Sequence, residues 1–499
     1  MFLHQPSLFK SLCYVNGRWI HSDSGDSQAV HNPADHTLLG HVPMLGQSQI
    51  EAAVRAAHRA FLTWRQADAG ARAQCLRQWA RLMATHREDL ATLISLEQGK
   101  PIAEALGEID YAISFIDWYA EQARRLDGRL MPSHIQNAQP GTLMTPVGVA
   151  ALITPWNFPS AMITRKAAAA LAAGCTVVVK PAHETPYSAL ALAHLSEQAG
   201  FAPGLFNVVL GEPQMAMETL VSHPLVRAVS FTGSTRVGHL VRQAAARTGI
   251  KPLALELGGN APFIVTADAD PHAAVDVAVA AKFQTSGQDC CAANRILVHR
   301  RHYDEFLRHY AQAVSALTVG PGTQPGSRIG PLIHEAALRA TAERVADAQA
   351  QGARLLAGGH PHVLGGLYFE PTVLADVRPG MRIYDEENFA PISGVCAFDT
   401  LDKAIQLAND TPYGLAAYVC ASRQDVIWHL LRNLEFAMIA VNGARFTGAP
   451  IPFGGMKESG AGREGGHEGF EPFVETKYFC LNGLGRPAES TYFQGACHE

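Results

Sequence analysis

The 499 residues are 47% hydrophobic and 17% charged, which excludes a disordered chain and allows about three domains of ~150 residues. The 40 basic and 45 acidic residues give a formal charge of −5 without a basic cluster, so nucleic acid is not an expected partner. Apolar runs stay below the ~18–20 residues that cross a bilayer, and the first residues lack the features of a signal peptide. We therefore expect a cytoplasmic protein with no membrane partner.

The nine cysteines are scattered and odd in number, which is not the pattern of a disulfide framework. No Cys-x-x-Cys pair or His/Cys cluster has the spacing of a zinc site. This usage is typical of a reducing compartment, and we expect no metal.

The first 126 residues predict a strand pair followed by helices. Residues Tyr14–Ile20 alternate in polarity around Asn16-Gly17, which is typical of a β-hairpin. Ser48 and Glu51 have the spacing of a capping box, so we expect a helix to begin after Ser48. Apolar residues recur at helical spacing through 50–64, 75–94 and 109–126.

From residue 148 onward, short apolar strands alternate with helices. The predicted strands of the first series are 148–153, 176–179, 206–210, 227–231 and 253–257, with helices at 160–173 and 188–200. A second series runs from 262 to 446 and includes strands at 263–265, 295–298 and 438–441. Such alternation is typical of parallel sheets that bind dinucleotides at the carboxyl ends of their strands. The predicted fold class is therefore α/β with two parallel-sheet units, the first of them Rossmann-like.

Two polar segments lie outside both series and predict a small additional β element. They are residues 129–144 and 475–482. Because an isolated pair of strands is only marginally stable, we expect these strands to form a subunit interface in a homodimer or homotetramer. Residues after 483 look like a frayed tail.

Four short loops carry residue types that can bind a ligand or take part in catalysis. Thr232–Gly238 places two glycines at a helix start, where backbone N–H groups can approach a phosphate, although Gly-x-Gly-x-x-Gly is absent. Pro155–Pro159 fixes an aromatic ring and an amide between prolines, and Glu256–Asn260 places a carboxylate beside Gly-Gly. Gly287–Cys291 places a thiol on a loop after a helix. Each loop taken alone also has an ordinary structural explanation, as a turn, a cap or a buried cysteine.

The order of the motifs is more informative than any one of them. Pro155–Pro159, Val179–Ala182, Phe231–Gly238, Glu256–Asn260, Gly287–Cys290, Glu386–Phe389 and Pro452–Lys457 follow one another along the chain. In this order they strongly resemble the aldehyde dehydrogenase superfamily from Tyr14 to about Asn482. The segments Lys457–Gly465 and Glu475–Tyr478 are similar to the succinate-semialdehyde dehydrogenase branch.

The resemblance implies a reaction and its catalytic residues. Cys290 is the expected nucleophile, the Asn157 amide and the Cys290 N–H hold the oxyanion, and Glu256 is the general base for water. The implied reaction is NAD(P)+-dependent oxidation of an aldehyde, such as succinate semialdehyde, to its acid through a thiohemiacetal and a thioester. Alternatives are a different polar or aromatic aldehyde, a coenzyme A-acylating relative or a non-catalytic relative, and Glu256 argues against the acylating one.

The resemblance also implies a cofactor site. Lys180 corresponds to the adenosine-ribose contact, Gly233 and Ser234 to the pyrophosphate and nicotinamide region, and Glu387 and Phe389 to the nicotinamide ribose. The remaining expected cofactor contacts are Pro155, Trp156, His183, Glu184, Gly238 and Leu257. NAD-preferring relatives usually carry Glu where His183 stands, so we expect NADP+ to be accepted. The alternative is that Glu184 restores NAD+ selectivity.

The expected substrate contacts are Arg165, Gln284, Arg445 and Thr447. In the semialdehyde branch two arginines and a hydroxyl grip the distal carboxylate, and Gln284 stands where the second arginine is usual. Arg165 still favours an ω-carboxylated semialdehyde, because a lone cation is costly in an apolar tunnel. The alternative is that Arg165 pairs with Asp289.

Four residues near the nucleophile depart from the family pattern or need an explanation. Thr285 replaces a usual Asn, and Ala390 replaces a usual Gly. Asp289 is expected to raise the pKa of the Cys290 thiol, and must therefore point away or touch the substrate. Cys291 either forms a disulfide with a neighbour under oxidation or is unreactive.

The resulting domain assignment has four parts. Residues 1–127 and 147–257 are expected to form the dinucleotide-binding domain, and 258–458 the catalytic domain with the nucleophilic cysteine. Residues 128–146 and 470–484 are assigned to oligomerisation strands and 485–499 to the flexible tail.

Overall fold

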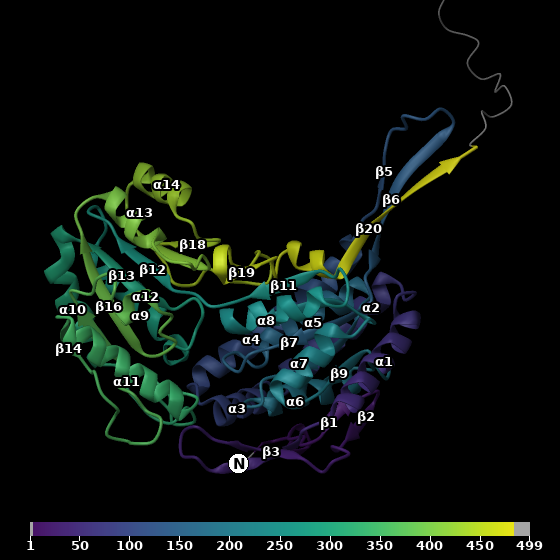
Figure 1. Cartoon of the computed structure of the whole chain (residues 1–499), viewed down its shortest axis with the longest axis horizontal. Helices are drawn as coiled ribbons and strands as arrows, with labels where there is room; N and C mark the ends of the chain where they lie inside the picture. Colours follow the sequence, from purple (N-terminus) through teal and green to yellow (C-terminus); the bar gives the residue numbers. More distant parts are fainter. Residues whose placement is uncertain (1–2, 484–499) are drawn as a thin grey trace, which may run out of the picture.

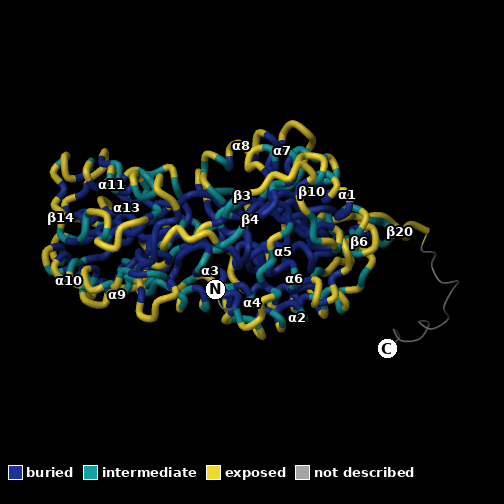
Figure 2. Tube along the Cα trace, turned by 90° about the horizontal axis from the view of Figure 1, so that it is seen from below, coloured by how far each residue is buried: buried dark blue, intermediate teal, exposed yellow. Residues whose placement is uncertain are grey.

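The computed structural model describes residues 3–483. Two α/β lobes lie side by side, and a narrow β arm projects from the first lobe (Figure 1). Each lobe has its own buried interior (Figure 2). The predicted α/β class with two parallel sheets and a small extra β element is confirmed. No helix in the described part of the chain is long and apolar enough to cross a membrane.

The first lobe contains an eight-stranded sheet in the order β19-β11-β10-β7-β8-β9-β1-β2. Its five inner strands from β11 to β9 run parallel, and β19, β1 and β2 join antiparallel at the edges. The predicted hairpin is confirmed, because Asn16 and Gly17 take positive φ angles of 51° and 73° between β1 and β2. The bounds are β1 (Cys13–Val15), β2 (Arg18–Ile20), β7 (Val149–Ile153), β8 (Thr176–Lys180), β9 (Phe206–Val208), β10 (Val226–Thr232), β11 (Leu253–Glu256) and β19 (Gly460–Ala461).

Eight helices belong to this lobe. Every residue of the alanine-rich α5 is buried, because small side chains let it pack closely against the sheet and against α4. The expected start of α1 is wrong: Gly46, not Ser48, is the N-cap, and the Gln49 side chain accepts the Gly46 N–H at 3.3 Å. The bounds are α1 (Gln47–Trp64), α2 (Ala69–Thr85), α3 (Arg87–Gln98), α4 (Ile102–Gln122), α5 (Ala161–Ala173), α6 (Pro186–Gln198), α7 (Pro213–Ser222) and α8 (Thr235–Ala246). A separate ladder pairs β3 (Ser27–His31) with β4 (Leu38–Pro43).

The second lobe contains a seven-stranded sheet in the order β14-β15-β16-β13-β12-β17-β18. All neighbouring strands are parallel except β14 and β15. Its strands are β12 (Ala261–Val265), β13 (Ala293–His299), β14 (Arg354–Ala357), β15 (Thr372–Ala375), β16 (Ile392–Phe398), β17 (Ala416–Cys420) and β18 (Met438–Val441). Its helices are α9 (Pro271–Phe283), α10 (Tyr303–Ser315), α11 (Glu335–Ala350), α12 (Arg382–Asp385), α13 (Leu401–Asn409) and α14 (Gln424–Asn433). Short 3₁₀ turns are η1 (Pro6–Leu8), η2 (Ala123–Arg125), η3 (Gln284–Gly287), η4 (Arg300–His302), η5 (Lys457–Ser459) and η6 (Glu468–Phe473).

The arm is a three-stranded antiparallel sheet of β5 (Arg129–Leu130), β6 (Ala138–Pro146) and β20 (Val474–Asn482). It extends away from both lobes (Figure 1), and it exposes Leu143, Tyr478 and Leu481. The strand expected at 475–482 is β20. Residues 470–473, which the domain assignment groups with it, lie in η6 and bury two phenylalanines in the first lobe. The predicted tail lies outside the described residues.

Candidate functional site

The loop that carries Cys290 is a tight turn between η3 and β13. The Ala292 N–H donates to the Asp289 carbonyl at 3.0 Å, and the Cys291 N–H donates to Asp289 Oδ1 at 2.9 Å. Asp favours this first turn position because its side chain can accept a local N–H. Cys290 follows at the second position and is half-buried. The Gly258-Gly259 backbone packs against the Cys290 carbonyl so closely that a Cβ at Gly259 would overlap it.

The Cys290 thiol lies in an environment that disfavours its charged form. A hydrogen bond with Cys291, burial, and the nearby Asp289 and Glu387 carboxylates raise its pKa well above the ordinary value. The Asp289 carboxylate does not point away from the thiol, because one of its oxygens and the two sulfurs lie within 4.8 Å of one another. Cys290 therefore rests as a thiol and needs a base before it can attack.

Asn157 is tied directly to this turn from the end of β7. Its Nδ2 donates to the Gln288 carbonyl at 3.1 Å, while its own backbone carbonyl accepts the Lys100 ammonium at 2.7 Å. Lys100 also pairs with Glu108 at 2.7 Å, and both side chains are fully buried. Glu108 accepts the Ser160 N–H at 2.9 Å at the start of α5. This network fixes the predicted amide beside the predicted nucleophile.

Glu256 ends β11 with its carboxyl group buried. Within residues 3–483, neither carboxyl oxygen has a hydrogen-bond partner. Burial and the neighbouring Glu464 raise its pKa well above the ordinary value, and Arg165, Lys166 and Arg463 act in the opposite direction. A buried carboxyl with both oxygens free is available to take a proton from water or from a thiol.

Glu464 is the main site residue that the sequence did not reveal. Its carboxylate pairs with Arg165 Nε at 2.5 Å and with the Lys166 ammonium, and it accepts from Ser230 Oγ at 3.1 Å. The alternative that Arg165 pairs with Asp289 is therefore wrong. Arg165 also lies over the Phe453 ring at 4.2 Å. No local pattern joins α5 to a residue 298 positions later, so only the folded structure shows this pair.

Two of the four predicted substrate contacts come together. Tyr111 on α4 lies close to Arg165 and Thr447, and both oppose the increase in its pKa caused by burial. Thr447 is exposed and lines a cavity of about 180 Å³ together with Phe446, Pro452 and Phe453. Gln284 and Arg445 are exposed, and neither side chain makes a hydrogen bond or ion pair in the described part of the chain. Tyr111 had no sequence signal beyond a helical apolar stripe.

The predicted phosphate-binding turn lies beside the base. The Gly233 N–H donates to the Glu256 carbonyl at 3.0 Å, and the Ser234 hydroxyl accepts the Val237 N–H at 3.4 Å as the N-cap of α8. Gly238 packs against the Leu257 side chain with no room for a Cβ. The first turn of α8 is therefore close to β11, with its N-terminus at the carboxyl ends of the strands.

Lys180 ends β8 as a buried cation whose side chain has one 3.4 Å hydrogen bond, to the Pro181 carbonyl. Burial lowers its pKa, and Glu184 and Glu212 oppose that change. His183 Nε2 lies 3.5 Å from Glu184 Oε1. The remaining donors of Lys180 fit the hydroxyl groups of a nucleotide ribose.

A second group of predicted cofactor residues faces the nucleophile loop. Glu387 accepts the Gly259 N–H at 2.8 Å, and burial raises its pKa to about 7. The Trp156 and Phe389 rings meet edge to face with centroids 5.5 Å apart, and Pro155 precedes Trp156 in the same loop. Lys180 and the N-terminus of α8 lie at the carboxyl ends of the first sheet, and Glu387 faces them from the second lobe. This set of groups fits a dinucleotide.

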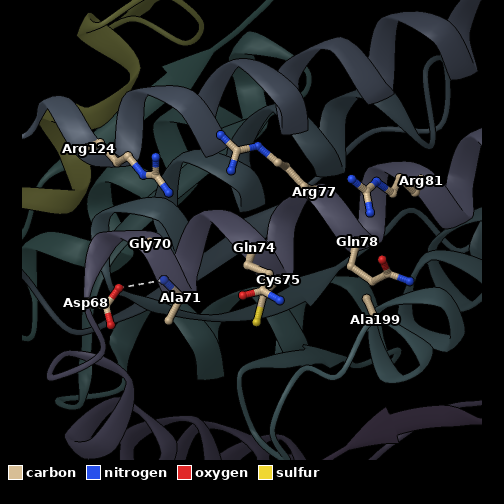
Figure 3. Close-up of a pocket in the computed structure, with 10 residues that line it drawn as sticks. All are labelled: Asp68, Gly70, Ala71, Gln74, Cys75, Arg77, Gln78, Arg81, Arg124 and Ala199. Atoms are coloured by element: carbon tan, nitrogen blue, oxygen red, sulfur yellow. Dashed lines mark hydrogen bonds between the residues drawn. The ribbon is translucent and has the colours of Figure 1, made fainter.

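Two further groupings lie away from these residues. A cavity of about 820 Å³ next to α2 is lined by polar side chains including Arg77, Arg81 and Arg124, and it contains none of the predicted site residues (Figure 3). His272, Glu305 and His309 place three ligand-type atoms within 4.8 Å of one another between α9 and α10. Because they come from two helices, the sequence spacing used to look for metal sites could not show this group.

Thr285 is held in a strained backbone conformation. Thr285 has φ 50°, in the left-handed region, and its buried hydroxyl has no partner among the described residues. A β-branched residue there costs about 1–2 kcal/mol, whereas Asn adopts this conformation more easily. We predict that Thr285→Asn raises the free energy of unfolding by about 1 kcal/mol, measured by urea denaturation. Thr285→Ala is the control, and an equal gain there would contradict the argument.

The comparisons with known proteins agree with this geometry. The family model described as the aldehyde dehydrogenase family matches residues 19–479. The chain is 53% identical to the non-phosphorylating aspartate-semialdehyde dehydrogenase of Halomonas elongata, covering 96% of this chain and 97% of that protein. It is 46% identical to the NADP(+) succinate-semialdehyde dehydrogenase of Escherichia coli, covering 96% of this chain and all of that one. A crystal structure of an E. coli NADP-dependent enzyme superimposes with a TM-score of 0.95 at 46% identity, covering 96% and 100% of the two chains. The chain therefore belongs to the aldehyde dehydrogenase family and is an NAD(P)+-dependent oxidoreductase that acts on aldehydes.

Proposed function

We propose that Cys290, Asn157 and Glu256 carry out this oxidation. The Cys290 sulfur forms a bond to the aldehyde carbon, and the carbonyl oxygen becomes an oxyanion held by the Asn157 amide and the Cys290 N–H. NAD(P)+ bound beside it supplies the acceptor for the hydride. The resulting thioester at Cys290 is attacked by water as Glu256 takes one of its protons, and the acid leaves with the thiol restored. The unpartnered Glu256 carboxyl is the observation that supports the hydrolytic outcome over acyl transfer to coenzyme A.

The raised pKa of the Cys290 thiol makes proton removal a separate requirement. Glu256 is a buried carboxyl that can receive that proton, and its own raised pKa makes it a stronger base than an exposed glutamate. It passes this proton to solvent before it takes a proton from water, and it returns the second proton to the Cys290 thiolate when the acid leaves. Glu464, held ionised by Arg165 and Lys166 against the effect of burial, keeps a negative charge behind Glu256. This arrangement supports proton uptake by Glu256.

For the substrate we propose a short semialdehyde that carries a carboxylate at its far end. The relatives named for aspartate and succinate semialdehyde act on such molecules. Tyr111 and Thr447 lie near Cys291 and supply hydroxyl donors that support carboxylate binding. Arg165 lies in the same group, although its charge is paired with Glu464. Gln284 and Arg445 are proposed outer contacts on the strength of the family pattern.

A comparison of matched aldehydes tests the proposed function. Succinate semialdehyde and butanal have chains of equal length and differ in the carboxylate. We expect kcat/KM to be at least about tenfold higher for succinate semialdehyde, because the free energy of one charge-assisted hydrogen bond corresponds to about that ratio. The assay follows reduced cofactor formation with and without coenzyme A. Equal kcat/KM values would contradict the proposed substrate class, and a requirement for coenzyme A would contradict hydrolysis.

We propose that NADP+ is accepted, since His183 provides no charge that repels a 2′-phosphate. We expect His183→Glu to lower kcat/KM for NADP+ at least about tenfold relative to NAD+. Glu184→Gln is the control, because Glu184 lies against His183 and offers the alternative source of NAD+ selectivity. A wild-type preference for NAD+ above about a hundredfold, relieved by Glu184→Gln, would contradict the role of His183.

The same proposal assigns roles to the parts of the fold. The first sheet with its helices supports cofactor binding, and the second lobe carries the nucleophile. The exposed apolar residues of the β arm support its use as a homodimer or homotetramer interface. The scattered cysteines support a reducing location such as the cytoplasm.

A further inference from the structure

Asp289 places a carboxyl group without an ion-pair partner beside the nucleophile, among the residues that the structure describes. Oδ1 accepts the Cys291 N–H, and no lysine, arginine or histidine within residues 3–483 forms an ion pair with this carboxylate. Lys100 and Lys282 are near enough to lower its pKa, but each is bound elsewhere, to Glu108 and to Asn294 Oδ1 at 2.7 Å. Besides the Cys291 N–H, the Cys290 thiol is the polar group that lies against this carboxylate.

The nearby cation Arg165 does not balance the charge of Asp289, because it is already neutralised by another carboxylate. Arg165 is paired with Glu464, and the neutral Gln284 stands at the end of α9. Burial raises the pKa of Asp289, which reflects the cost of keeping its charge without a cation. A bound molecule that carries a positive group at this point removes that cost.

We propose that Asp289 binds an ammonium group of the substrate, so that the enzyme prefers an α-amino semialdehyde to the same semialdehyde without the amine. This inference rests on the proposed function. With the aldehyde carbon at the Cys290 sulfur, the amine-bearing carbon of a four-carbon amino semialdehyde is two C–C bonds away, each about 1.5 Å. An Asp289 oxygen lies within 4.8 Å of both sulfurs. An ammonium group two bonds from the aldehyde carbon can therefore reach this oxygen. The distal carboxylate then continues toward Tyr111 and Thr447.

The competing explanation is that Asp289 only shapes the turn. Asparagine separates the two roles, because its side-chain oxygen still accepts the Cys291 N–H while its charge is gone. Asp270→Asn is the matched control, since Asp270 likewise accepts a backbone N–H two residues ahead, at the exposed start of α9.

The test compares L-aspartate semialdehyde with succinate semialdehyde, which differ only in the α-ammonium group. We expect wild type and Asp270→Asn to favour aspartate semialdehyde in kcat/KM, and Asp289→Asn to reduce that ratio at least about tenfold. Because loss of the Asp289 charge also lowers the pKa of the Cys290 thiol for both substrates, the readout is the ratio of the two kcat/KM values and not the absolute rate with succinate semialdehyde. An unchanged ratio, or an equal loss for both substrates, would show a turn or positioning role and overturn the inference while leaving the proposed function intact. Failure of wild type to oxidise either semialdehyde would overturn both.

Discussion

Replacing Cys290 with alanine is expected to lower dehydrogenase activity by at least about 10³-fold, because no other group then forms the covalent intermediate. Any esterase activity should disappear with it. Binding of NAD(P)+ should remain nearly unchanged, since the proposed cofactor contacts lie on β8, α8 and the loop after α12. Steady-state rates and a cofactor titration of the variant measure the two effects separately.

Cys291→Ala is the matched control for this prediction. The two thiols lie within 4.8 Å of each other, and the neighbouring Cys291 is the largest cause of the raised pKa of Cys290. Removing Cys291 should therefore lower the pKa of Cys290 and leave the enzyme active. An inactive Cys291→Ala together with an active Cys290→Ala would mean that the nucleophile is assigned one residue too early.

Replacing Glu256 with glutamine is expected to separate the two halves of the reaction. Oxidation at Cys290 should still produce a burst of reduced cofactor, and thioester hydrolysis should slow by ~10²–10⁴-fold because the general base is missing. In wild type, kcat should rise as pH rises through the raised pKa of Glu256, since only the ionised form accepts a proton. That limb of the pH profile should be absent from the variant. Rapid mixing followed by steady-state measurement records both phases.

Glu458→Gln is a suitable control, because Glu458 is exposed and contacts His239 at the surface. It should show wild-type turnover and no burst. Wild-type turnover in Glu256→Gln would require another base, and the ionised Glu464 is the nearest candidate.

The sequence predicted those parts of the fold that have a strong local signal. Asn16-Gly17 required a hairpin, and the apolar strand Met438–Val441 has the bounds expected for it. The start of α1 was missed by two residues because Gly46 with Gln49 competes with the similar spacing of Ser48 and Glu51. The left-handed Thr285 could not be expected from propensity, since Thr disfavours that conformation and is held there by its surroundings.

The proposed catalytic residues come from the order of motifs, whereas their electrostatic setting could not be predicted from it. The pairing of Glu464 with Arg165 and Lys166 joins positions almost 300 residues apart, and no periodicity links them. As a result the sequence predicted that Arg165 binds a substrate carboxylate or pairs with Asp289, whereas in the structure it pairs with Glu464 and Asp289 has no ion-pair partner among the described residues.

The most direct test of the central claim is to identify the residue that carries the acyl group. Glu256→Gln enzyme is mixed with NADP+ and succinate semialdehyde, stopped in acid during the slow phase, and analysed by peptide mass mapping with fragmentation between Cys290 and Cys291. The account predicts one succinyl group on Cys290 and none when NADP+ is omitted. A succinyl group on Cys291, or no acyl group while reduced cofactor accumulates, would contradict it.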